Sequence, residues 1–229
     1  MAFQAVFPRV MHLAFGPGLA TSTAVSWWQV TGKTCVAAYQ PIGAASLAAS
    51  YINLANPGTY DAAPGVAPTW ASLTGWAFVA SQYLKTGVVP ASGYSILVRF
   101  MDSTASGDNY LAGCTNSSGN EFWVTHRFIG LGCNYANGTR LGAVLPNETS
   151  GVLAFAGSIA YRNGVAEAGS MLGTYTITRD IYIGGLNTGP GGFYGEYLNT
   201  KICAIAIYSD TLTAGEVATV SAAMAALTG

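Results

Sequence analysis

The C-terminal stretch constrains the fold of this chain more than any other segment. Residues 201–208, Lys-Ile-Cys-Ala-Ile-Ala-Ile-Tyr, form an apolar run of strand length that is rich in β-branched and aromatic side chains, which is typical of a buried strand. A Ser-Asp pair follows, and its short polar side chains favour a turn. Thr213 and Glu216 have the spacing of a capping box and predict a helix that ends near Leu227. A strand, a tight turn and a capped helix therefore close the domain.

The remainder of the chain predicts an all-β sandwich. Strand-length segments recur roughly every ten residues without a helical pattern between them, unlike a chain of alternating strands and helices. The Asn-Gly pairs at 137–138 and 163–164 predict tight hairpin turns. Strands are expected at 35–39, 94–100, 110–114, 121–128, 131–135, 151–155, 158–162, 181–185 and 201–208. The predicted fold is a two-sheet antiparallel jelly roll with a short C-terminal helix.

An extended N-terminal arm is expected before the sandwich. Its large apolar side chains fall on one parity, the period of a strand, and Pro8 restricts such a strand to a sheet edge or a bend. The arm and a lead-in strand occupy residues 1–34, and the jelly-roll domain occupies 35–229. The residues expected to contact another subunit are Phe3, Phe7, Met11, Leu13 and Phe15. A strand docked on its own domain is the alternative interpretation.

The charge of the chain excludes several classes of partner. Only 8% of the residues are charged, 51% are hydrophobic and the net charge is −1. Such a composition disfavours disorder and removes the usual basis for binding nucleic acid. No apolar run approaches the roughly 18 residues of a membrane span, and no export signal is recognised near the N-terminus. A surface of small polar residues suits a protein covered by other subunits, as in a homo-oligomer, or one that contacts a glycan.

Several short motifs occur in a fixed order between residues 35 and 227. They are Tyr83-Leu84-Lys85-Thr86-Gly87, the strand Tyr94–Phe100, the hairpin Tyr161–Val165, Ile181-Tyr182-Ile183-Gly184-Gly185, and the closing set Ile202, Ile205, Ile207, Tyr208, Leu212, Thr213, Glu216 and Val217. Together they resemble the motifs of laminin-G-like domains, which belong to the concanavalin A-like lectin/glucanase superfamily. The resemblance implies a concanavalin A-like jelly roll. Residues 36–90 are also similar to structural proteins of tailed phages and prophages that carry such a domain.

These resemblances imply a function in assembly. The expected protein is a non-enzymatic structural or decoration subunit of a tailed-phage virion, assembled in the host cytoplasm through apolar contacts and with affinity for glycans. The alternative is a secreted or surface carbohydrate-binding module, which would be extracellular. The fold does not decide between them, because it hosts lectins, glycosidases and adhesion modules.

No catalytic residue is predicted. Glycosidases of this superfamily place two glutamates and an aspartate at alternate positions of one strand, and a retaining pair needs carboxyl groups about 5 Å apart. No two acidic residues of this chain lie within five positions of each other, so the usual arrangement is absent. His126 has no partner serine in a Gly-x-Ser-x-Gly turn and is interpreted as structural.

Binding residues are predicted from residue type and position. A sugar-binding site would use an exposed aromatic ring, and the candidates are Trp70, Trp76, Trp123, Tyr194 and Tyr197. Calcium is the one cofactor considered, and its candidate ligands are Asp102, Asp108, Asn109 and Asp180. Calcium needs about six oxygen ligands, and no compact ligand run is present. Turn residues that bond their own backbone are the alternative.

The four cysteines are too few and too scattered for a disulfide framework or a zinc site. In the fold that the resemblance implies, the opening and closing strands are neighbours, which would place Cys35 opposite Cys203. Free thiols are still expected at Cys35, Cys114, Cys133 and Cys203, because unexported proteins assemble under reducing conditions.

Overall fold

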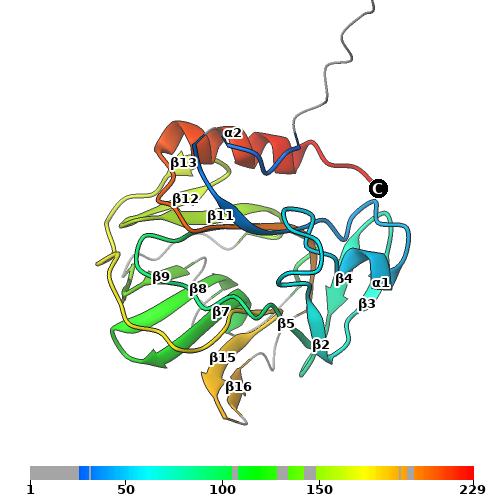
Figure 1. The fold of residues 1–229 in the computed structure, drawn as a ribbon, viewed down its shortest axis with the longest axis horizontal. Coiled ribbons are helices and arrows are strands. Elements are labelled where there is room, and N and C mark those ends of the chain that lie inside the picture. The colour runs from blue at the N-terminus through cyan, green and yellow to red at the C-terminus, as the bar shows by residue number, and fades with distance from the viewer. Residues whose placement is uncertain are drawn as a thin grey trace, which may run out of the picture.

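Two packed sheets, a one-turn helix and a C-terminal helix make up the structure, a computed structural model that describes residues 26–30, 32–104, 108–127, 134–141, 148–190, 192–194 and 199–229 (Figure 1). The predicted all-β sandwich with a short C-terminal helix is confirmed. The five apolar residues of the arm lie outside the described residues, so the predicted subunit contact stays a prediction. No helix among the described residues is long and apolar enough to cross a membrane.

The first sheet has eight strands, and every pair in it is antiparallel. In spatial order its strands are β13 (Val165–Ala166), β12 (Ile159–Arg162), β11 (Gly151–Ala156), β6 (Ser95–Met101), β17 (Thr200–Tyr208), β4 (Gly75–Phe78) and β3 (Thr69–Ala71), and β1 (Cys35–Tyr39) pairs with β17. β17 is therefore bonded to three other strands. Because both of its faces are covered, eight of its nine residues are buried, which explains the continuous apolar run.

The second sheet has nine strands. They are β10 (Thr139–Arg140), β9 (Asn134–Asn137), β8 (Asn120–Arg127), β7 (Asn109–Ser117), β14 (Tyr182–Ile183), β5 (Tyr83–Lys85) and β2 (Ala63–Val66), with β15 (Leu186–Gly189) and β16 (Gly192–Tyr194) beside them. All described pairs are antiparallel except β15 with β7, which is parallel. Gly113 of β7 pairs with both Tyr182 of β14 and Leu186 of β15. The chain therefore runs antiparallel to β7 in β14, turns, and runs parallel to β7 in β15.

Two apolar layers hold these elements together. The main core lies between the sheets and contains large buried rings such as Trp76, Phe100 and Phe155. A second cluster lies on the other face of the first sheet, where Ala204, Ala206 and Tyr208 of β17 are covered by the C-terminal helix. Alternate residues of β17 thus pack into the two apolar layers, because successive side chains of a strand point to opposite faces.

Helix α2 (Ala214–Ala225) begins as predicted. The hydroxyl of Thr213 accepts from the backbone N–H of Glu216 at 3.3 Å, and the Glu216 carboxylate accepts from the Thr213 N–H at 2.7 Å, which completes the capping box. At the other end Arg99 of β6 donates to the carbonyls of Met224 and Leu227 at 2.8 and 2.7 Å. The other described helix, α1 (Leu47–Ser50), has a single turn.

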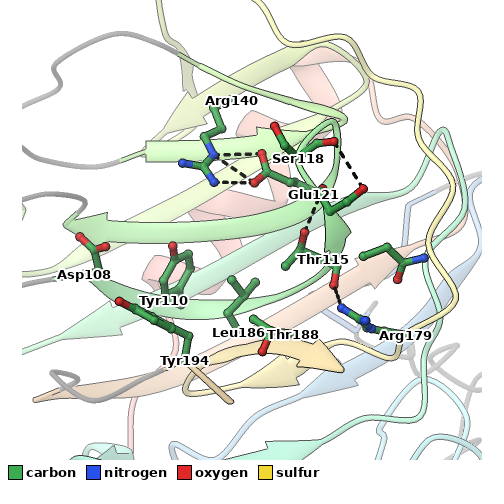
Figure 2. Close-up of a pocket in the computed structure, with 12 residues that line it drawn as sticks. Asp108, Tyr110, Thr115, Ser118, Glu121, Arg140, Arg179, Leu186, Thr188 and Tyr194 are labelled. Carbon is green, nitrogen blue, oxygen red and sulfur yellow. Dashed lines mark hydrogen bonds and ion pairs between the residues drawn. The ribbon is translucent and has the colours of Figure 1, made fainter. Parts of the chain in front are cut away.

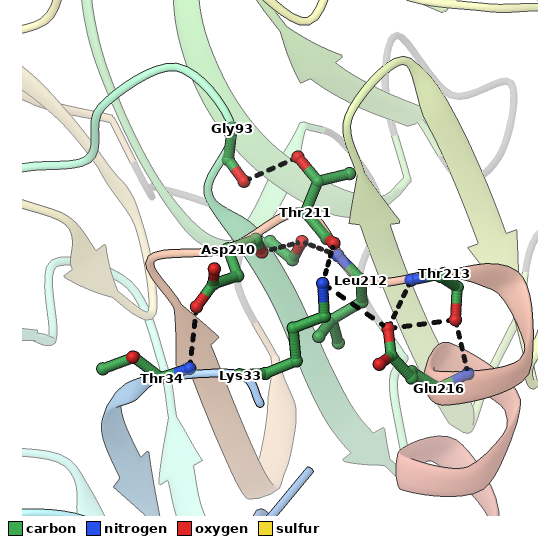
Figure 3. A network of polar contacts seen from close by, with 9 residues as sticks. Lys33, Thr34, Gly93, Asp210, Thr211, Leu212, Thr213 and Glu216 are labelled. Carbon is green, nitrogen blue, oxygen red and sulfur yellow. Dashed lines mark hydrogen bonds and ion pairs between the residues drawn. The ribbon is translucent and has the colours of Figure 1, made fainter. Parts of the chain in front are cut away.

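The segment before β1 is fastened to the side of the sandwich that carries α2 (Figure 3). Residues 26–30 and 32–34 form turns rather than the expected lead-in strand. Thr34 donates its N–H to the Asp210 carboxylate at 2.7 Å, and Lys33 donates to the Thr211 carbonyl at 3.1 Å. The Tyr208 hydroxyl donates to the Trp28 carbonyl at 2.8 Å. The Ser-Asp turn after β17 therefore also anchors this segment.

The expected position of the cysteines is only partly correct. β1 and β17 are neighbours, as expected, but Cys35 lies opposite Tyr208, five positions from Cys203 along β17, so the two thiols do not face each other. Cys35, Cys114 and Cys203 are free, and Cys133 lies outside the described residues. Burial raises the pKa of the Cys203 thiol to about 11, which keeps it protonated at neutral pH.

Candidate functional site

A cleft of about 400 Å³ lies on the outer face of the second sheet (Figure 2). Phe122 and Val124 of β8 belong to the main core, whereas Trp123 between them belongs to a separate small cluster with Tyr110 and Leu186. Because successive side chains of a strand point to opposite faces, this cluster lies on the face turned away from the core. Tyr110 and Leu186 of this cluster form the floor of the cleft, which residues of strands β7, β8, β10, β15 and β16 surround.

The floor of the cleft is aromatic. The ring of Tyr110 packs edge-on against Trp123 at 5.3 Å and against Tyr194 at 6.1 Å. Trp123 is fully buried, and the guanidinium of Arg140 lies 5.6 Å from the centre of its ring. Tyr194 is 48% exposed and lines the cleft. An accessible ring is therefore supported from below by buried rings.

One wall of the cleft is an ion pair between the buried Glu121 and the half-exposed Arg140. Arg140 donates from Nε to both carboxylate oxygens of Glu121 at 3.0 Å and from Nη2 to Oε1 at 2.7 Å. Glu121 is buried, so its charge needs this partner, because an unpaired buried carboxylate is strongly destabilising. The hydrogen bond to Glu121 in turn raises the pKa of Arg140. The pair is a rigid set of polar atoms at the edge of the cleft.

The opposite wall contains Arg179, which donates to the backbone carbonyl of Thr115. The Arg179 guanidinium lies against Gly189, whose φ is +116° and where an added Cβ would come within 2.5 Å of Nη2. Only glycine allows both this backbone conformation and this close approach. Asn116 beside them exchanges hydrogen bonds of 3.3–3.4 Å with Thr178. This wall is therefore also held in one geometry.

The phenol of Tyr110 is uncharged at neutral pH. Burial, followed by the negative charge of Asp108, raises its pKa above the usual value near 10. The hydroxyl therefore keeps its proton and can both donate and accept a hydrogen bond.

The hairpin formed by β15 and β16 is fastened by a stack of three rings. Phe193 stacks on Tyr83 with centroids 4.6 Å apart, and Tyr83 stacks on Tyr182 at 4.8 Å. Phe193 also covers Gly185, where a Cβ would lie 2.0 Å from the ring. Phe193 and Tyr194 are consecutive in a strand and point to opposite sides. The stack therefore holds the hairpin from one side while Tyr194 lines the cleft on the other.

The aromatic residues predicted from the sequence to bind sugar lie in different places in the structure. Tyr194 lines the cleft. Trp76 and Trp123 are fully buried and have no ring face for a sugar, so as stacking residues they were wrong predictions. Trp70 packs against the main core and donates its indole N–H to the Pro41 carbonyl at 2.8 Å, away from the cleft. Tyr197 lies outside the described residues.

The predicted calcium ligands are not brought together. Asp102 pairs with Lys201 at 2.6 Å, whereas Asp180 accepts from the Gly87 N–H at 3.2 Å. Asn109 is fully buried, and Asp108 lines the cleft. Within the described ranges, no group of three or more His, Cys, Asp or Glu side chains could hold a metal ion. The four residues are therefore not one calcium site.

Sequence reasoning missed Glu121, Arg140 and Arg179. A signal for Glu121 was present, because Glu121 and Trp123 are two apart in a strand and so share a face. No local pattern connects Glu121 with Arg140, which is 19 residues later, or with Arg179. These contacts arise only from the order of the strands.

Comparison with known proteins supports the architecture. No protein family and no curated protein matches the sequence. Among solved structures, the Trypanosoma rangeli sialidase in complex with 2,3-difluorosialic acid aligns with a TM-score of 0.55 and 14% identity over 81% of this chain. The chain spans about one third (32%) of the length of that sialidase chain.

Two further structures are similar. Domain 4 of AbnA, a GH43 extracellular arabinanase from Geobacillus stearothermophilus in complex with arabinotriose, aligns with a TM-score of 0.50 and 14% identity, over 82% of this chain and 98% of that one. The binding domain of botulinum neurotoxin serotype G aligns with a TM-score of 0.54 and 13% identity, over 84% of this chain and 51% of that one. At such identities the similarity concerns the fold, and the chain is a β-sandwich domain of this architecture.

Proposed function

We propose that this chain is a carbohydrate-binding β-sandwich module and that the cleft on the second sheet binds the sugar. The observation that carries the proposal is the exposed ring of Tyr194, which lines a cleft whose polar side chains are held by internal hydrogen bonds. This function corresponds to the alternative that the sequence left open, an extracellular lectin-like module.

The chemistry of the cleft suits a sugar. A sugar ring offers apolar C–H faces and a belt of hydroxyl groups, so its site needs apolar surface together with well-placed donors and acceptors. Tyr194 and Leu186 supply apolar surface, and the hydroxyls of Thr188 and Ser118 line the same space. Because the walls are already held by internal hydrogen bonds, little ordering would accompany binding.

The similar structures support this proposal without establishing it. Domain 4 of the arabinanase aligns with this chain over 98% of its own length and was solved with arabinotriose. The sialidase was solved with a sialic acid derivative, although this chain matches only part of it. The role as a virion subunit remains a prediction, since the arm that would contact other subunits lies outside the described residues and no observation favours it.

We expect binding without hydrolysis. Both oxygens of Glu121 accept hydrogen bonds from Arg140, which opposes their use as a nucleophile or a proton donor. Incubation with β-glucans, arabinans and sialylated oligosaccharides should therefore release no reducing ends. Release that disappears in Glu121→Gln or Asp108→Asn would show that the cleft is catalytic.

The direct test of the proposed function is glycan binding. The wild-type protein should bind a subset of an oligosaccharide array, and Tyr194→Ala should weaken that binding about tenfold or more, because the ligand loses an aromatic surface. Tyr60→Ala is the matched control, since Tyr60 is similarly exposed (44%) and does not line the cleft. Absence of binding to the whole array, or equal effects of the two substitutions, would contradict the proposal.

The ring stack provides a second test. Phe193→Ala should leave the sandwich folded but release the hairpin, so that Tyr194 is no longer held in place and glycan affinity falls severalfold. Phe193→Tyr preserves the stack and should retain affinity. Isothermal titration calorimetry gives the affinities, and the near-UV circular dichroism of each variant checks the fold. Unchanged affinity in Phe193→Ala would mean that the stack does not position the site.

A further inference from the structure

The charges that line the cleft are unequally paired. Four charged side chains face it: Asp108, Glu121, Arg140 and Arg179. Glu121 and Arg140 neutralise each other at 2.7 Å. Arg179 differs, because none of the ion pairs found among the described residues involves it. The cleft therefore contains a cation that no carboxylate of the described structure balances within 4.0 Å.

The guanidinium of Arg179 is nevertheless held firmly. It donates to the Thr115 carbonyl and rests on the backbone of Gly189. The next residue, Asp180, forms no ion pair with it within 4.0 Å; its carboxylate accepts from the Gly87 N–H at 3.2 Å and from the Asn187 side chain at 3.0 Å. Most of the five N–H donors of Arg179 therefore remain available to a ligand, and they lie in one fixed plane at the edge of the cleft.

A planar, preorganised guanidinium is best matched by a planar group with two negative oxygens. We propose that the glycan bound in the cleft is acidic and that Arg179 binds the carboxylate of a uronic or sialic acid residue. This inference rests on the proposed function and names the ligand class of the same site.

The positions of the acidic side chains orient such a ligand. In Figure 2, Asp108 and Tyr194 lie at one end of the cleft and Arg179 lies at the other. The sugar carboxylate would be attracted to the Arg179 end and repelled from Asp108. The cleft is therefore polarised along its length.

Calorimetric titrations with matched ligands test the proposal. The probes are 3′-sialyllactose and tetragalacturonate, each beside the methyl ester of the same oligosaccharide, together with lactose sulfated on its galactose. The wild-type protein should bind at least one acid about ten- to a hundredfold more tightly than its ester, which is the range of a charged hydrogen-bonded contact. The preference should decrease with added salt.

Variants at position 179 locate the effect. Arg179→Gln should bring the ratio of acid to ester affinity to about one, whereas Arg179→Lys keeps the charge and should retain part of the preference. Thermal unfolding and near-UV circular dichroism show whether each variant is folded. If Arg179→Gln is misfolded, the acid and ester affinities of Arg179→Lys are compared with those of the wild-type protein instead.

The outcomes separate this inference from the proposed function. Equal binding of acid and ester, or a preference that survives in Arg179→Gln, overturns the acidic ligand and leaves a module for neutral glycans. Tighter binding of the sulfated lactose than of either carboxylate overturns the assignment of a carboxylate. If no oligosaccharide binds, here or on the array, both proposals fail.

Discussion

Replacement of Asn53 with alanine is expected to lower the free energy of unfolding by about 3–5 kcal/mol. Asn53 is fully buried, and its amide makes four hydrogen bonds to backbone groups of β1 and of the loop that contains Asn53. Its oxygen accepts from Ala38 and Ala55 at 2.9 and 3.0 Å, and its nitrogen donates to Val36 and Thr59 at 2.9 and 2.8 Å. Each buried group left without a partner destabilises by about 1–3 kcal/mol.

Urea unfolding followed by tryptophan fluorescence measures this effect. Asn56→Ala is a matched control in the same loop, because Asn56 is exposed and its substitution should change stability by less than about 0.5 kcal/mol. Asn53→Asp keeps the two acceptor bonds but places a negative oxygen against two carbonyls, so it should also be strongly destabilising. Similar stabilities of Asn53→Ala and Asn56→Ala would show that this loop does not depend on Asn53.

The second large effect is a loss of stability in acid that depends on His126. Burial, followed by the positive charge of Arg127, lowers the pKa of His126 from 6.5 to about 4. Between these values the unfolded chain binds a proton that the native protein does not, so stability falls as the pH falls from 6.5 towards 4. Since one unit of pKa corresponds to about 1.4 kcal/mol, the loss at pH 4 is about 3 kcal/mol.

The structure explains why this histidine stays neutral. His126 lies at the end of β8 against Phe100, with ring centres 5.2 Å apart, and Nε2 contacts the hydroxyl of Ser103. Nδ1 has no hydrogen-bond partner among the described residues, and no carboxylate is among the causes of the lowered pKa. The interpretation of His126 as structural therefore agrees with its surroundings.

The pH effect is measured against a variant that cannot titrate. Free energies of unfolding of the wild-type protein and of His126→Gln, determined between pH 4 and 7, contain the same contributions from the carboxylates. The difference between the two proteins should therefore change by about 3 kcal/mol across this range, in favour of the variant at low pH. Parallel curves would mean that His126 is protonated equally in the native and unfolded states.

Much of the fold could be predicted because its signals are local. The capping box of Thr213 and Glu216 needs only four consecutive residues, and the structure has both of its hydrogen bonds. The Asn-Gly pair at 163–164 forms the turn between β12 and β13, with both residues at positive φ. The lead-in segment was predicted less well. A lead-in strand was expected before residue 35, but Trp27 and Trp28 of this segment lie in a turn and pack against the second cluster.

The site could be predicted only in fragments. Tyr194 was recognised as a candidate, but exposure cannot be read from residue type, and Trp123 shows why. It points to the outer face of the second sheet, yet it is fully buried among its cluster, with Arg140 over its ring and Tyr110 packed against it. Arg179 carries no local motif, because its role depends on the approach of Gly189 and of the Thr115 carbonyl.

The placement of α2 has a consequence for how copies of this domain can be combined. The helix and the lead-in segment pack on the first sheet, whereas the cleft opens on the outer face of the second, so the side of the sandwich that fastens residues 26–30 and 32–34 is turned away from the cleft. A tether or scaffold joined to the helix-bearing side would leave the cleft unobstructed. If the cleft binds a glycan as proposed, the clefts of domains grouped in this way would face outward, and several of them could hold one repeating polysaccharide. Weak single-site binding would then add up to an avidity that one domain alone does not provide.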